Sequence, residues 1–277
     1  MLKQRVITAL VLLALLVPAM LAENAIWFDG LTLILMAAGA WEWGRLQGMS
    51  HRSAVVSGVL IGALLLFSRW LPNATPAPQA VAWLGALIWV PGVYWMVKHG
   101  LQRWGQVAAF WRLSLGWLAV AVAWWSLVAV KAQGLNFLLS VLTLVWAADI
   151  AAYFGGRAWG RRKLAPHISP GKTWAGAISG ALAVLCLGLL WVWFDVRTLQ
   201  ASPSLYTELW QRAPWWCLVA GAILVAFSVL GDLVESLVKR VAGVKDSSQL
   251  LPGHGGVLDR VDALLPVLPM ALWMTWW

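Results

Sequence analysis

The chain has 277 residues, of which 61% are hydrophobic and only 11% charged, with a formal net charge of +9. A soluble globular domain carries about a quarter charged residues, so this composition excludes an ordinary soluble fold. The positive charge is spread between apolar runs and is not gathered in a soluble basic domain, which argues against nucleic acid as a partner.

Apolar runs long enough to cross a bilayer recur along the whole chain. Nine membrane spans are predicted, at residues 6–22, 26–42, 54–71, 79–97, 109–130, 134–154, 174–194, 214–236 and 257–277. With a cytoplasmic N-terminus, 16 of the 20 basic residues fall in cytoplasmic segments and 4 fall outside, as the positive-inside rule requires. The sequence therefore predicts an all-α, polytopic integral membrane bundle of about nine transmembrane helices, typical of a bacterial inner membrane.

A single transmembrane domain with two unequal halves is predicted. Residues 1–130 carry few polar groups at membrane depth and are interpreted as scaffold spans. Residues 131–277 are interpreted as the catalytic half, because the polar residues gather in two of its cytoplasmic loops, 155–173 and 237–256. The main charged residues of the scaffold half at membrane depth are expected to sit at an interface or to pair locally: Asp29, Glu42 and Arg112.

Three carboxylates are predicted to meet at one depth, at the cytoplasmic ends of the last two spans. About 20 helical residues cross a ~30 Å hydrocarbon core, and counting along the eighth span places Asp232 at its inner edge. The residues after Ala263 are too few to span, so the last helix is expected to start near Val257 and to bring Asp259 and Asp262 to the same depth. Carboxylates this close repel one another, and we interpret them as ligands of Mg²⁺. For Asp259 alone, the alternative is a favourable charge in the first turn of a helix.

Basic residues and a glycine-rich bend accompany these carboxylates. Ser236 and Lys239 follow Asp232 at i+4 and i+7, on one helix face. The bend Pro252-Gly-His-Gly-Gly256 leads into a helix N-terminus, where backbone N–H groups favour an anion. The residues predicted to meet phosphates here are Lys239, Arg240, Lys245, His254, Gly255, Gly256 and Arg260. Membrane anchoring is the alternative for the basic residues, and satisfying the turn is the alternative for His254. Carboxylates, a metal, bases and an anion-binding turn are typical of phosphoryl or nucleotidyl transfer, and their depth indicates a lipid substrate.

The stretch from Ser236 to Asp262 resembles the signature of the phosphatidate cytidylyltransferases, or CDP-diacylglycerol synthases. The positions that carry the resemblance are Ser236, Lys239, Arg240, Lys245, Asp246, His254, Gly255, Gly256, Asp259, Arg260 and Asp262. A second segment, from Asp149 to Trp174, is similar to the family's cytoplasmic segment ahead of a late span. There, Ser169 and Lys172 are interpreted as phosphate or nucleotide contacts, with membrane anchoring as the alternative for Lys172.

The resemblance implies that CTP and phosphatidate react to CDP-diacylglycerol and pyrophosphate at the inner leaflet, with the active site facing the cytoplasm. The residues expected to act in catalysis are Asp232, Lys239, Asp246, Asp259 and Asp262, of which Asp232, Asp259 and Asp262 hold Mg²⁺. The residues expected to bind substrate are Ser169, Lys172, Ser236, Arg240, Lys245, His254, Gly255, Gly256 and Arg260. Asp246 is either a ligand or orients Lys245. The sequence leaves open a second, monovalent cation and a homodimer within the membrane lipid.

Three alternatives remain at this point. Another lipid-phosphate enzyme, such as a CTP-dependent polyprenol kinase or a CDP-alcohol phosphotransferase, would also place charge at the membrane surface. A transporter would place its carboxylates near the bilayer midplane, between paired halves with broken helices. A membrane scaffold without catalysis would leave the clustered carboxylates without an explanation.

Overall fold

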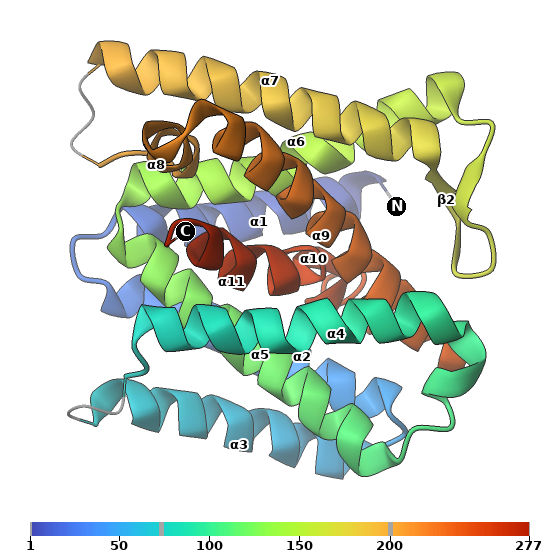
Figure 1. Ribbon diagram of the computed structural model, residues 1–277. Coiled ribbons are helices and arrows are strands. Elements are labelled where there is room, and N and C mark those ends of the chain that lie inside the picture. The colour runs from blue at the N-terminus through green and yellow to red at the C-terminus, as the bar shows by residue number, and fades with distance from the viewer. Residues whose placement is uncertain (1, 72–74, 199–201, 277) are drawn as a thin grey trace.

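The chain folds as a bundle of helices with one short hairpin, seen in a computed structural model that describes residues 2–71, 75–198 and 202–276 (Figure 1). The helices of the first half are α1 (Leu2–Leu21), α2 (Ile26–Leu46), α3 (His51–Trp70), α4 (Pro78–Trp104) and α5 (Ala109–Ala132). The second half contains α6 (Leu135–Trp159), β1 (Lys163–Ala165), β2 (Ser169–Thr173), α7 (Trp174–Thr198), α8 (Leu205–Arg212), α9 (Pro214–Val241), α10 (Leu258–Val261) and α11 (Leu264–Met274).

Among the described residues, seven helices are long and apolar enough to cross a membrane: α1, α3, α4, α5, α6, α7 and α9. Helix α2 is also long, with 21 residues, and carries Asp29, Glu42 and Arg45. The chain is an integral membrane protein with a polytopic helical fold, as predicted. The β1–β2 hairpin and the α4–α5 connection lie at one end of the bundle, and the C-terminal ends of α3 and α7 lie at the other (Figure 1). This alternation agrees with the predicted order of spans.

The predicted last span is not one continuous helix. The structure has a four-residue helix, α10, and an 11-residue helix, α11, and α11 alone is only about 16 Å long at 1.5 Å per residue. Pro266 explains the break, because it has no backbone N–H to donate to the carbonyl four residues earlier and its ring crowds that carbonyl. The residue four before Pro266 is Asp262, so the interruption falls on a predicted site residue.

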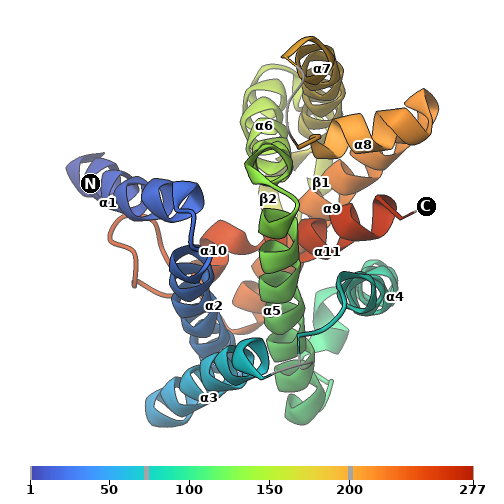
Figure 2. The ribbon, with the colours of Figure 1, turned by 90° about the vertical axis from the view of Figure 1, so that its left-hand side faces the viewer.

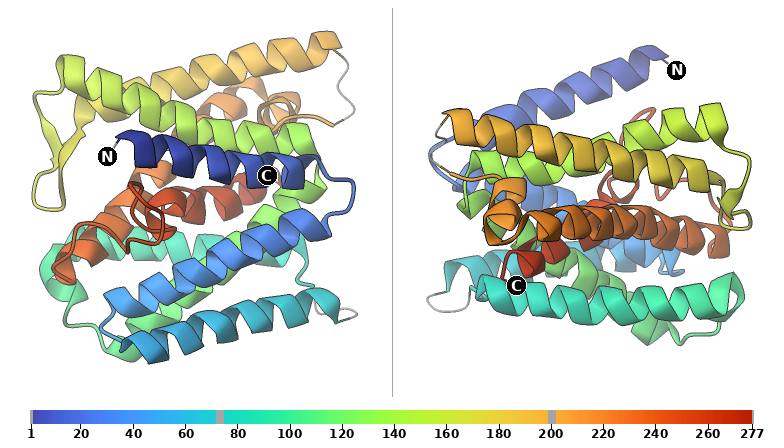
Figure 3. Two further views of the ribbon diagram at one scale, coloured as in Figure 1. Left: turned by 180° about the vertical axis from the view of Figure 1, so that it is seen from behind. Right: turned by 45° about the horizontal axis from the view of Figure 1, so that its top comes forward.

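The short helix α11 lies at the centre of the bundle, packed against α4, α5 and α9 (Figure 3). Its side chains Leu268 and Leu272 are fully buried. Helix α1, by contrast, stands at the edge, beside the segment that leads into α10 (Figure 2). There Arg5 Nε donates to the Gly253 carbonyl (3.0 Å) and Thr8 Oγ1 donates to the Pro252 carbonyl (2.8 Å). The first helix of the chain thus contacts the glycine-rich bend of the last quarter.

Candidate active site

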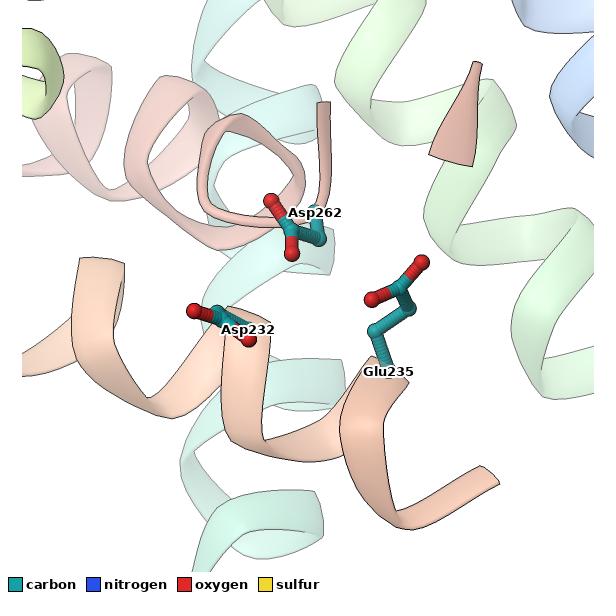
Figure 4. Close-up of side chains that lie close together, drawn as sticks. All are labelled: Asp232, Glu235 and Asp262. Atoms are coloured by element: carbon teal, nitrogen blue, oxygen red, sulfur yellow. The ribbon is translucent and has the colours of Figure 1, made fainter. Parts of the chain in front are cut away.

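Three carboxylates from two elements point toward one another near the C-terminal end of α9 (Figure 4). Asp232 and Glu235 lie on α9, and Asp262 lies at the break between α10 and α11. One carboxylate oxygen from each lies within 4.8 Å of those from the other two. We call these three residues the carboxylate cluster. Spacing of i,i+3 puts the two α9 residues on one face, as helical geometry requires.

A glycine and a proline bring the two elements close enough to form the carboxylate cluster. A Cβ placed on Gly231 of α9 would lie 2.5 Å from the Asp262 carbonyl oxygen and 2.8 Å from the Pro266 ring. No side chain fits in that space, so glycine allows α9 to approach the helix break directly. Pro266 cannot donate to the Asp262 carbonyl, and Asp262 and Ala263 keep helical backbone angles between α10 and α11. The Asp262 side chain faces Asp232 (Figure 4).

Lys172 reaches the carboxylate cluster from the β1–β2 hairpin. Its Nζ lies 2.7 Å from Asp232 Oδ2 and donates to the Val229 carbonyl at 3.1 Å. Ser236 Oγ donates to the other oxygen, Asp232 Oδ1, at 3.1 Å. Asp149 on α6 is close enough to Lys172 and Asp232 for their charges to act on it. The structure therefore joins Lys172, Ser236 and Asp232, which the sequence placed in two separate segments.

Lys239 connects the carboxylate cluster to Asp259. Its Nζ lies 2.5 Å from Glu235 Oε2 and 2.5 Å from Asp259 Oδ1. Asp259 Oδ2 accepts from the backbone N–H groups of Ser247 (2.9 Å) and Gly256 (2.8 Å), and lies 3.0 Å from Ser247 Oγ. Burial of Asp259 favours the neutral acid, but these hydrogen bonds and the Lys239 charge outweigh it and hold the pKa of Asp259 below its ordinary value.

Asp259 is thus bound by protein donors and stands outside the carboxylate cluster. Its predicted role as a metal ligand stays a prediction, and the carboxylate beside Asp232 and Asp262 in the structure is Glu235. Glu235 precedes Lys239 by four residues on α9, and the two side chains form an ion pair. Its i,i+3 relation to Asp232 was the signal for its place in the carboxylate cluster.

The glycine-rich bend folds tightly against Asp259. Gly253 and Gly255 have positive φ angles of 77° and 83°, a region that L-residues with side chains rarely adopt. A Cβ on Gly255 would lie 2.6 Å from Asp259 Oδ2. Arg260 closes the bend by donating from Nε and Nη2 to the His254 carbonyl at 3.0 and 2.6 Å. In this conformation the bend positions Asp259, and it is held in place by Arg260.

The remaining predicted site residues lie around this centre. Arg240, Lys245 and Asp246 are exposed at and just beyond the end of α9, and Arg240 Nη1 donates to the Val244 carbonyl at 3.4 Å. Ser169 lies half-buried on β2, three residues before Lys172. Their substrate contacts stay predictions.

Glu42 on α2 is a positioning residue that the sequence interpretation missed. Its side chain is 0% exposed, and both of its oxygens accept hydrogen bonds from the catalytic half. Oε1 accepts from Ser248 Oγ (2.6 Å) and Val257 N (2.9 Å), and Oε2 accepts from Leu258 N (2.7 Å) and lies 3.1 Å from Ser247 Oγ. The carboxylate therefore caps the start of α10 and orders the loop before it. A charged residue in an apolar helix was the available signal, but its partners lie more than 200 residues away.

Comparison with known proteins decides the family. The model of the Cytidylyltransferase family matches residues 3–277. This chain belongs to the cytidylyltransferase family. It is 39% identical over 284 residues to the phosphatidate cytidylyltransferase of Pseudomonas aeruginosa, covering 100% of this chain and 99% of that protein. It is 37% identical to the phosphatidate cytidylyltransferase of Haemophilus influenzae, covering 97% and 96% of the two chains.

Membership of the cytidylyltransferase family confirms the predicted resemblance and the predicted enzyme class, a nucleotidyltransferase. A third relative, the phosphatidate cytidylyltransferase of Brucella suis, is 43% identical over 163 residues, or 56% of this chain. The transporter and scaffold alternatives do not agree with family membership over the whole chain.

Proposed function

We propose that this protein transfers a cytidylyl group from CTP to phosphatidate, giving CDP-diacylglycerol and pyrophosphate. The proposal rests on one combination: the chain is similar over its full length to phosphatidate cytidylyltransferases, and its carboxylate cluster lies at the end of a membrane helix. We place the reaction at the cytoplasmic face of a bacterial inner membrane, since the positive-inside pattern puts the end of α9 on that side.

The carboxylate cluster fits a hard divalent cation. Asp232, Glu235 and Asp262 supply oxygens within 4.8 Å of one another from two elements, and Mg²⁺ in enzymes uses a few carboxylates and completes its shell with phosphate oxygens and water. When bound there, Mg²⁺ would neutralise charge on the reacting phosphates. Lys172 and Lys239 already balance part of the negative charge at Asp232 and Glu235.

The residues of this chain would mainly position the substrates. A phosphate oxygen of phosphatidate attacks the α-phosphorus of CTP, a new P–O bond forms, and the bond to the bridging oxygen breaks to release pyrophosphate. Such a transfer asks for alignment and charge neutralisation and needs no covalent enzyme intermediate. We assign phosphate binding to Lys172, Arg240 and Lys245, with Asp259 and Lys239 holding the carboxylate cluster in place. A homodimer and a second, monovalent cation stay predictions.

A radiolabelled CTP assay tests this function. Purified protein in detergent is mixed with CTP labelled at the α-phosphorus or, in a parallel assay, at the γ-phosphorus. Phosphatidate, diacylglycerol or a polyprenol is added, each with Mg²⁺ or with EDTA. We expect labelled CDP-diacylglycerol only with phosphatidate and Mg²⁺, and its loss on chelation. Nucleotide-dependent phosphorylation of the polyprenol, with no product from phosphatidate, would instead support a polyprenol kinase.

A further inference from the structure

An apolar cavity of about 510 Å³ lies between α4, α5 and α9. Its lining is almost entirely hydrophobic and includes the indole rings of Trp43, Trp89, Trp95 and Trp104. Glu235 and its neighbour Gly231 also form part of the wall. Since Glu235 belongs to the carboxylate cluster and Gly231 contacts Asp262, the cavity ends at the candidate active site.

Other lining residues are exposed on the outside of the bundle. The lining residues Leu87 and Leu115 are 67% and 41% exposed, and Pro91 and Gly92 are exposed beside them on α4. All four lie in or at helices long and apolar enough to cross a membrane. The cavity wall therefore includes both side chains exposed on apolar helices and Glu235 of the carboxylate cluster.

The volume of the cavity suits one acyl chain. At roughly 30 Å³ per small group, a cavity of about 510 Å³ has room for an acyl chain.

We propose that this cavity binds one of the two acyl chains of phosphatidate, so that the phosphate emerges at Asp232, Glu235 and Asp262. The inference rests on the proposed function and adds to it a site for the lipid chain. The second chain stays in the bilayer. Protein and lipid tails are about equally apolar, so the cavity gains little affinity from burial. Its effect is to position the headgroup, and it should therefore depend on chain length.

The test fills the cavity and varies the lipid. Gly92 lines the cavity and a Cβ there meets nothing within 4 Å, so Gly92→Phe adds a ring without a clash at the backbone. Ala119→Leu fills the cavity from α5 and is the second variant in case the first fails to fold. The matched control is Gly30→Phe on α2, where a Cβ also meets nothing within 4 Å and the residue does not line the cavity.

The readout is kcat/KM with dipalmitoyl and with dihexanoyl phosphatidate in mixed micelles. We expect kcat/KM of Gly92→Phe and of Ala119→Leu to fall about tenfold with the long-chain substrate and less than twofold with the short-chain one. In the control Gly30→Phe, kcat/KM should stay at the wild-type value with both substrates. Equal losses on both substrates, or none on either, would overturn the acyl-chain site while leaving cytidylyl transfer intact. If the wild-type protein turns over neither phosphatidate, the proposed function itself fails, and the acyl-chain site fails with it.

Discussion

Replacing Asp262 by Asn is expected to lower turnover by about 10²–10³-fold, the usual effect of removing one charge-stabilising group from an active site. The substitution keeps the shape of the side chain and its acceptor for the Ala263 N–H, now 2.7 Å from Oδ1. It removes one of the three charges of the carboxylate cluster. Turnover is measured with labelled CTP at saturating Mg²⁺, and folding is followed by thermal unfolding in detergent.

Three variants separate the carboxylate cluster from other acidic residues. Asp232→Asn should lose turnover like Asp262→Asn, whereas Glu23→Gln, on an exposed residue between α1 and α2, should behave as wild type. Asp259→Asn should lose both turnover and thermal stability, because it weakens bonds to Lys239, Ser247 and Gly256. Near-normal turnover in Asp262→Asn would remove that residue from the site.

Replacing Glu42 by Gln is expected to destabilise the protein by about 1–3 kcal/mol, the cost of leaving one buried donor unsatisfied. Glutamine has one acceptor oxygen where Glu42 has two, and Val257 N and Leu258 N bond to different oxygens. The amide group would face one of these N–H groups. Val257 and Leu258 lie at the start of α10, which leads to Asp259 and Asp262. We therefore also expect slower turnover, although Glu42 itself lies on α2, outside the carboxylate cluster.

The loop before α10 provides a local measurement of this effect. Lys245 is exposed, so limited trypsin digestion should cut after it faster in Glu42→Gln than in wild type. Glu23→Gln again serves as control. A Glu42→Gln protein with wild-type cleavage and wild-type turnover would show that the cap does not order the loop. Loss of turnover with unchanged cleavage would also contradict a positioning role.

Hydropathy and depth predicted much of the fold. Apolar runs located the long helices, and helical rise placed Asp232 and Asp262 at one depth, where the structure brings them together. The same count did not predict the break between α10 and α11. It treated residues 257–277 as one helix that brings Asp259 and Asp262 to the depth of Asp232. In the structure Asp259 contacts Lys239 and Ser247 instead of the carboxylate cluster.

Long-range contacts were beyond the sequence interpretation. Glu42 accepts hydrogen bonds from groups 205 to 216 positions away in the sequence. Lys172 contacts Asp232 from a hairpin that the hydrophobic pattern did not predict. Hydropathy reports which residues enter the membrane but not which helices pack together. The predicted division into a scaffold half and a catalytic half stays a prediction. Glu42, in the first half, accepts hydrogen bonds from the loop before α10 in the second half.

Titration of the purified protein with Mn²⁺, followed by electron paramagnetic resonance, tests the central claim most directly. Mn²⁺ prefers the same oxygen ligands as Mg²⁺ and gives a spectrum that changes on binding. The predicted result is a saturable site in the wild-type protein that weakens at least about tenfold in both Glu235→Gln and Asp262→Asn. A site of wild-type affinity in both variants would contradict a cation held by Asp232, Glu235 and Asp262.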